Sequence, residues 1–334
     1  MSVDQEALVS TEGAGLYQSV GAGHHTCWYP VGLSSDLAAG QVRGIDLCDG
    51  RIVLFRGEDG VARAMLPYCA HMGADLSVGD VVGNDIRCAF HHWQYGGDGR
   101  CTKIATGDRI PGAAVVRTLP IEEHDGLLWV WWGDTPAYEV PSFSSFEGEW
   151  AVRTFEVPLT AAVHVEPWVF AANVMDFQHL KSLHNVDVGN PDVEWNDWGA
   201  AMKWSFSRPE VGEINWDIEL FGTNSVRSVQ PQADGTIIGH IATTVPMGEQ
   251  GTKVFVVVVT NDLANAETIL EHQAQMHTNI ANEDMDVLST IRVGKANFTS
   301  SDKKLVQYMR YQRDYPKATM DELERGATPV AMRT

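Results

Sequence analysis

The sequence is poor in basic residues and in cysteine, and it lacks a long hydrophobic run. Its 334 residues include 24 Lys and Arg against 44 Asp and Glu, which gives a formal net charge of −20. Nucleic acids and anionic membrane surfaces bind cationic proteins, so this charge disfavours both as partners. The longest apolar run, VFVVVV at residues 254–259, predicts a buried strand and is too short to span a membrane.

Cysteine usage and the N-terminal residues bear on the cellular compartment. Five cysteines are too few, and are odd in number, for a disulfide scaffold. Residues 1–20 have neither the basic region nor the apolar region of a signal peptide. We therefore expect a cytoplasmic protein whose cysteines are reduced or bound to metal.

The pattern of strands, turns and helices predicts two domains. Short strands between Gly and Asp turns predict an all-β domain at residues 25–135, preceded by an arm at residues 1–24. A segment with prolines and serines predicts a linker at residues 136–150. Residues 151–334 combine a run of antiparallel strands with helices at the flanks, which predicts the α+β class. Helical periodicity is found in three stretches of this second domain, roughly residues 168–184, 265–293 and 301–315.

Two short stretches each place one cysteine and one histidine close together. They are CAH at residues 69–71 and CAFH at residues 88–91. Zinc fingers usually pair like with like, with two cysteines in one knuckle and two histidines in the other. Mixed pairs suit a two-iron cluster, because both cysteines can bind one iron and both histidines the other. A zinc site remains the alternative at this point.

The segment YCAHMGADLSVGDVVGNDIRCAFHHWQYGGDGRC, at residues 68–101, resembles the cluster-binding loops of the Rieske non-heme iron oxygenases. Their usual pattern is C-x-H, about sixteen residues, then C-x2-H. The resemblance implies that a [2Fe–2S] cluster is bound by Cys69, His71, Cys88 and His91.

The segment departs from the family pattern at two positions. Ala89 stands where the family often has proline, and His92 stands where glycine is common. The two-residue spacing selects His91 as the ligand, so we interpret His92 as a loop histidine. Cys27 follows His24 and His25, but its position in a loop favours a packed or surface residue over a metal ligand.

A second motif, NVMDFQHLKSLH at residues 173–184, places polar groups in an apolar segment. His179 and His184 are candidates for two ligands of a 2-His-1-carboxylate iron site. Five residues on a helix turn through about 500°, which leaves the two side chains about 140° apart. The helix must therefore end, bend or bulge between them if both bind one metal. Two unrelated core histidines are the alternative.

The third ligand would be a carboxylate from IANEDMDVLSTI, residues 280–291. Helical periodicity predicts an apolar face formed by Met276, Ile280, Val287 and Ile291. Asp284 falls on this face, whereas Glu283 and Asp286 are rotated away from it. Asp284 on this apolar face is interpreted as a metal ligand. The alternative is an aspartate that caps the backbone or hydrogen-bonds to water.

The two motifs together resemble the oxygenase component of Rieske oxygenases over roughly residues 25–295. The resemblance implies that Asp284 completes a mononuclear Fe(II) site and that the second domain has the helix-grip (START-like) fold. It further implies a homotrimer in which Asp176 links His91 of a neighbouring chain to His179. Capping of local backbone is the alternative role for Asp176. Asn173 would lie near the iron without binding it.

The resemblance also implies a reaction class. The chain is most similar to members with one subunit type, such as steroid 9α-hydroxylases, phthalate oxygenases and O-demethylases. We expect a terminal oxygenase that uses O2, and electrons from a separate reductase or ferredoxin, to hydroxylate a hydrophobic and steroid-like substrate. The alternatives are an O- or N-demethylase, a dioxygenase of an aromatic compound, a Rieske electron carrier without oxygenase activity, and a zinc-stabilised binding protein.

Overall fold

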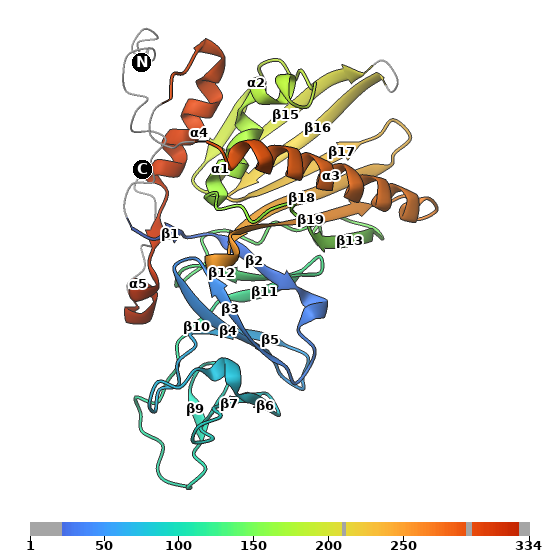
Figure 1. Cartoon of the computed structure of the whole chain (residues 1–334). Coiled ribbons are helices and arrows are strands. Elements are labelled where there is room, and N and C mark those ends of the chain that lie inside the picture. The colour runs from blue at the N-terminus through green and yellow to red at the C-terminus, as the bar shows by residue number, and fades with distance from the viewer. Residues whose placement is uncertain (1–21, 209–211, 292–295, 327–334) are drawn as a thin grey trace.

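The computed structural model describes residues 22–208, 212–291 and 296–326. Most of the arm predicted at residues 1–24 lies outside these ranges. Strands dominate the N-terminal part, and the C-terminal part combines a large antiparallel sheet with helices (Figure 1). The predicted α+β class is therefore confirmed. No helix within the described ranges is both long enough and apolar enough to cross a membrane.

The N-terminal part consists of short antiparallel strands in three sheets. One sheet has the order β10-β5-β4-β3, from Thr118–Leu119, Ala62–Met65, Gly50–Arg56 and Val42–Leu47. A second has the order β11-β12-β2, from Ile121–His124, Leu127–Trp131 and Trp28–Leu33. The third has the order β6-β7-β8-β9, from Asp80–Val82, Asp85–Arg87, Gln94–Tyr95 and Cys101–Lys103. This third sheet lies at the end of the molecule farthest from α2 (Figure 1).

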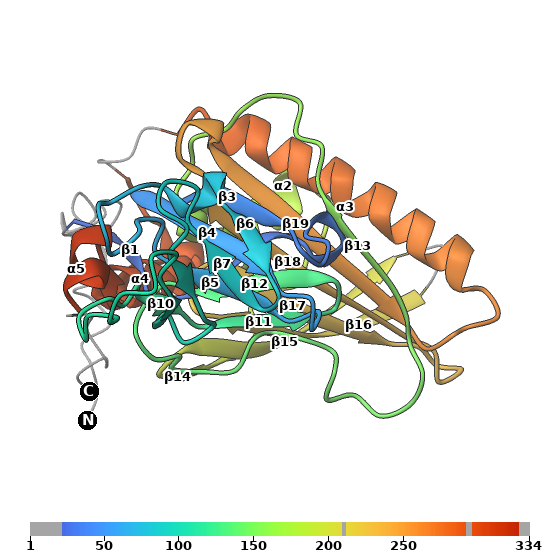
Figure 2. The same cartoon turned by 90° about the horizontal axis from the view of Figure 1, so that it is seen from below.

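The C-terminal part is built on a seven-stranded antiparallel sheet with the order β13-β19-β18-β17-β16-β15-β14. In that order the strands are Ala151–Glu156, Thr252–Thr260, Ile237–Pro246, Ser225–Pro231, Gly212–Phe221, Gly199–Arg208 and Val193–Asn196. The helices are α1 (Pro167–Ala172), α2 (Phe177–Ser182), α3 (Ala266–Leu288), α4 (Lys303–Asp314) and α5 (Met320–Arg325). The long helix α3 runs across the sheet on one side (Figures 1 and 2).

The two faces of this sheet belong to two different hydrophobic cores. Side chains alternate along a strand, so successive residues of β19 point to opposite faces. Phe255 and Val257 pack into the core shared with the N-terminal part, whereas Val254, Val256 and Val258 pack under the helices. All five are essentially buried, which explains why β19 has a continuous apolar sequence.

The C-terminal segment returns to the N-terminal part. Strand β20 (Lys317–Ala318) pairs with β1 (His24–His25), and Trp132 Nε1 donates to the Ala318 carbonyl at 2.9 Å. No helix or strand lies between the end of β12 at Trp131 and the start of β13 at Ala151. This gap coincides with the linker that we place at residues 136–150. The domain bounds stay a prediction, because one core draws residues from both sides of them.

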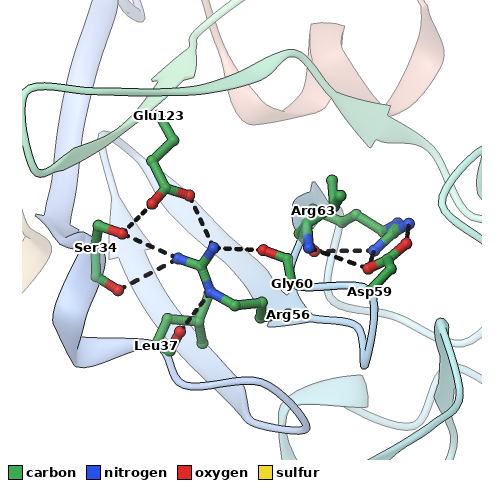
Figure 3. Close-up of polar contacts among 8 residues, drawn as sticks. Ser34, Leu37, Arg56, Asp59, Gly60, Arg63 and Glu123 are labelled. Atoms are coloured by element: carbon green, nitrogen blue, oxygen red, sulfur yellow. Dashed lines mark hydrogen bonds and ion pairs between the residues drawn. The ribbon is translucent and has the colours of Figure 1, made fainter.

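Arg56 at the end of β4 connects two sheets of the N-terminal part (Figure 3). Its guanidinium donates to the carbonyls of Leu37 at 2.6 Å and Gly60 at 2.7 Å, and to Glu123 of β11 at 2.8 Å. A further bond reaches Ser34 Oγ at 3.1 Å. Arg56 is 9% exposed, so these partners satisfy a charge that would be costly to bury alone.

Candidate metal centres

The two Cys/His pairs lie on two loops of the N-terminal part, and in each pair the cysteine is buried and the histidine exposed. Backbone bonds shape each loop: the Cys69 N–H donates to the Ala74 carbonyl at 2.9 Å, and the Cys88 N–H donates to the Trp93 carbonyl at 2.8 Å. The loops bring the rings of His71 and His91 to 4.6 Å between centroids. Two thiols thus face inward and two imidazoles face outward.

These four residues fit a two-metal cluster better than a single ion. Four ligands of one zinc ion would gather their donor atoms around one centre. In the described part of the chain, the group of His, Cys, Asp or Glu residues whose donor atoms all lie within 4.8 Å of one another is His179, His184 and Asp284. The two cysteines and two histidines of the loops do not form such a group. Cysteines on the inner side and histidines on the outer side match a [2Fe–2S] cluster with chemically different irons.

Two aromatic residues support this loop pair, and the sequence analysis did not name either. The Tyr95 hydroxyl lies 3.1 Å from Cys69 Sγ, and Trp93 stacks on His71 with ring centroids 4.4 Å apart. Burial raises the pKa of the Cys69 thiol, so a nearby cation or metal is needed to hold it as a thiolate. Both aromatics follow the second histidine in the sequence HHWQY, which is the signal that could have identified them.

The backbone explains the family's preference for glycine at the position of His92. His92 has φ of 57°, in the left-handed region that glycine adopts without strain. Its side chain is exposed beside His91. Cys27 is fully buried, with Sγ 3.6 Å from Thr223 Oγ1, so of the two expected roles, packed or surface residue, it has the first.

The second motif forms a broken helix. Helix α1 is followed by a 3-10 turn at Asn173–Met175, and α2 begins at Phe177. Asp176 caps α2, since its Oδ1 accepts the His179 N–H at 3.1 Å. Because α2 ends at Ser182, His184 lies beyond the helix and can turn toward His179. The predicted interruption between the two histidines is confirmed.

His179, His184 and Asp284 come together although α3 lies about 100 residues later in the chain. Their donor atoms all lie within 4.8 Å of one another. His184 Nε2 is 2.8 Å from Asp284 Oδ1, and His179 Nε2 is 3.7 Å from the same oxygen. The Asp284 side chain is 6% exposed, and its hydrogen bond raises the pKa of His184. Two imidazoles and one carboxylate are the donor set of non-heme Fe(II) sites, so the residues fit such an ion.

Glu283 also contacts this group. Its Oε2 lies 3.4 Å from His184 Nδ1, on the ring atom opposite the one that faces Asp284. A carboxylate there orients the imidazole and favours the tautomer that leaves Nε2 free to bind a metal. Asp286 is exposed on the other side of α3, with Oδ1 3.4 Å from Thr160 Oγ1.

The apolar face predicted for α3 was partly wrong. Val287 is 48% exposed, and α3 ends at Leu288, so Ile291 lies outside it. The buried stripe instead runs through Ala274, His277, Ala281, Asp284 and Leu288. Small and polar residues mark this stripe, and a count of large apolar residues therefore misses it. The prediction that Asp284 is buried was nevertheless right.

Asp176 is not one of the three carboxylate and imidazole residues that converge. The carbonyl of Asp176 lies 2.8 Å from His179 Nδ1, which orients that ring. Asp176 and His179 also line an open cavity of about 450 Å³. The Asn173 carbonyl accepts the Asp176 N–H at 3.2 Å, and its side chain is half-buried. Asp176 therefore supports His179 from within its own chain while facing open space.

Comparison with known proteins gives three findings. Residues 27–120 match the family model of the Rieske [2Fe-2S] domain. The chain is 36% identical over 166 residues to a probable 3-ketosteroid-9-alpha-monooxygenase, oxygenase component, of Rhodococcus rhodochrous, covering 47% of this chain and 40% of the relative. It is 33% identical to a cholesterol 7-desaturase of Bombyx mori, covering 47% of this chain and 35% of that relative. These matches span less than half of either relative's length.

Solved structures match over nearly the whole chain. The crystal structure of dicamba monooxygenase bound to dicamba superposes with a TM-score of 0.69 and 19% identity. The match covers 91% of this chain and 98% of that one. At this identity the likeness establishes the fold, including the C-terminal sheet and its helices, and leaves the substrate open.

Proposed function

We propose that this chain, a Rieske-domain protein with the fold of the Rieske oxygenases, is the terminal oxygenase of a multicomponent system. It would use O2, and electrons from a separate reductase or ferredoxin, to hydroxylate a hydrophobic substrate. The observation that carries the proposal is the convergence of His179, His184 and Asp284 around a buried carboxylate. A Rieske electron carrier has no use for this second donor set.

Each metal centre has a separate task in this proposal. Cys69, His71, Cys88 and His91 would hold the [2Fe–2S] cluster, and the exposed histidines form its outer surface. His179, His184 and Asp284 would hold a mononuclear Fe(II), which supplies the oxygen chemistry when bound. Glu283 and the Asp176 carbonyl hold the two imidazole rings in orientation. The protein thus contributes the ligands and their alignment.

Electron transfer would occur between neighbouring copies of the chain. The cluster loops and α2 lie at opposite ends of one chain (Figure 1), and electron transfer between metal centres requires close approach. A head-to-tail homotrimer would bring His91 of one chain to Asp176 of the next, and Asp176 already contacts His179. The open cavity at Asp176 is consistent with such a neighbour. Asn173 would lie close to this contact.

The substrate class follows from the relatives. Two of the similar proteins are named for a ketosteroid and for cholesterol, and one is a monooxygenase while the other is a desaturase. We propose a steroid-like substrate and hydroxylation as the reaction. We also propose a cytoplasmic location.

Metal content and spectrum test the proposal first. Purified protein should contain about three irons and two acid-labile sulfides per chain, with a red-brown colour that bleaches on reduction. With a steroid, O2 and a reductase, it should form a hydroxylated product. Two irons per chain, no site refilled by added Fe(II), and no product would leave only the electron-carrier function. A colourless protein with stoichiometric zinc would contradict both.

A further inference from the structure

Three aromatic residues of the C-terminal part have ring nitrogens without a hydrogen-bond partner. They are Nε1 of Trp216, Nδ1 of His240 and Nε2 of His277. His240 and His277 are 4% and 9% exposed. Buried polar nitrogens are almost always hydrogen-bonded, so three that are not, in one place, require an explanation. None of the three was singled out by its sequence pattern.

The three rings form one group between the sheet and α3. The ring centroids of His240 and His277 are 4.2 Å apart, and those of Trp216 and His240 are 5.1 Å apart. His240 on β18 pairs with Val258, which packs under the helices, and Trp216 packs against the same core. The group therefore lies on the helix-facing side of the sheet.

This group is aligned with the mononuclear centre along α3. His277 and Asp284 are both buried on α3 and are seven residues apart. Seven residues are two helical turns, so the two side chains share one face and are separated by roughly 10 Å along the axis. The three nitrogens and the metal ligand Asp284 therefore lie along one buried face of α3.

Helix α3, which covers the group, contains no Lys or Arg. Three basic side chains described on the neighbouring strands, Lys203, Lys253 and Arg227, are paired with Asp217, Glu156 and Glu219 respectively. Each lies one residue away from a side chain of the helix-facing core, and hence on the other face. Burial lowers the pKa of His277 to about 4 and that of His240 well below its usual value, so both rings are neutral at pH 7.

We infer that Trp216, His240 and His277 form a polar subsite that hydrogen-bonds an uncharged oxygen, a ketone or hydroxyl, of the substrate. Trp216 supplies an N–H donor, and the unpartnered nitrogen of each neutral imidazole is a donor or an acceptor according to its tautomer. A carboxylate is disfavoured because α3 carries no Lys or Arg, and the three basic side chains described on the neighbouring strands are already paired with carboxylates. The inference deepens the proposed function, since the oxygen would be held roughly two helical turns from the iron ligands and so would fix which carbon faces them.

The test is a binding measurement that needs neither O2 nor electrons. Equilibrium dialysis of the holoprotein is carried out with a steroid monoketone and its parent hydrocarbon, and with decalone and decalin. The ketone of each pair should bind roughly 5- to 10-fold tighter than its hydrocarbon. Trp216→Phe and His277→Phe should bring this ratio toward one and leave hydrocarbon affinity unchanged.

Trp204→Phe is the matched control. Trp204 stacks on Trp216 with ring centroids 6.1 Å apart, but its Nε1 already donates to Met202 Sδ at 3.1 Å. The ketone preference should survive in this variant. The subsite is refuted if no ketone binds, if wild type shows no preference, or if the preference persists in both Phe variants. A ketone preference without oxygenation would refute the proposed function alone, and oxygenation without the preference would refute the subsite alone.

Discussion

Replacing Asp284 with Asn tests the mononuclear centre directly. The substitution keeps the shape of the side chain but removes its charge, so a weak amide oxygen replaces the carboxylate among the three donor groups within 4.8 Å. The two imidazoles remain, with centroids 5.2 Å apart. We expect iron affinity at this site to fall by at least about 100-fold, because loss of even an outer partner of a metal ligand costs 10- to 100-fold.

The loss should be visible in iron content, activity and stability. Iron should fall from about three to about two per chain, with about two sulfides and an unchanged visible spectrum. Hydroxylation should be lost. A metal held at 100 times its Kd stabilises the folded state by about 2.7 kcal/mol, so added Fe(II) should raise the thermal midpoint of wild type and not of the variant.

Asp286→Asn provides the matched control. Asp286 lies two residues further along α3 and is exposed, and its carboxylate accepts a hydrogen bond from Thr160 Oγ1 at 3.4 Å. Its replacement should leave three irons and full activity. Three irons in the Asp284→Asn variant, with activity retained, would refute the assignment of Asp284 as a ligand.

Three further predictions concern the N-terminal part and its contacts. His92→Gly should keep the visible spectrum and change the free energy of unfolding by less than about 1 kcal/mol, since φ of 57° suits glycine. His91→Ala should instead abolish the cluster spectrum. Cluster loss in the His92 variant would contradict the ligand assignment. Arg56→Met should destabilise by about 3 kcal/mol in urea unfolding, because it removes the donor to the buried Leu37 carbonyl and to the part-buried Gly60 carbonyl. Arg63→Met, whose partner is a surface carboxylate, should destabilise by less than about 1 kcal/mol. Equal losses would show that these carbonyls contribute nothing. Burial lowers the pKa of His25 to about 3, so below about pH 6.5 the unfolded chain binds a proton on this histidine that the folded chain does not yet bind. The free energy of unfolding should therefore decrease by up to about 1.4 kcal/mol per pH unit as the pH falls. His25→Gln should reduce this slope, and an unchanged slope would contradict the reasoning.

Motif spacing predicted much of the site from sequence. The C-x-H and C-x2-H pairs identified four residues whose inward thiols and outward imidazoles lie on adjoining loops. The five-residue gap between His179 and His184 required a helix to end, bend or bulge between them, and α2 ends at Ser182. Such inferences succeed because they depend on local geometry, which the sequence contains directly.

Contacts between distant segments were beyond the reach of local patterns. The hydroxyl of Tyr95 on Cys69 and the meeting of His240 with His277 depend on strand order and on where α3 crosses the sheet. The face of α3 was misjudged for a related reason, because Val287 is exposed while His277 is buried. A helix that lines a polar site buries polar residues, so hydrophobicity alone is misleading there.

The double-sided burial of β19 limits how this protein can change over evolution. Successive side chains of β19 pack alternately into two hydrophobic cores, one under the helices and one shared with the N-terminal part. Insertion or deletion of a single residue would exchange the occupants of both cores at once. A strand with one wet face would tolerate such a slip far better. We therefore expect length variation among relatives to fall in the connections between strands, and β19 to vary by substitution alone.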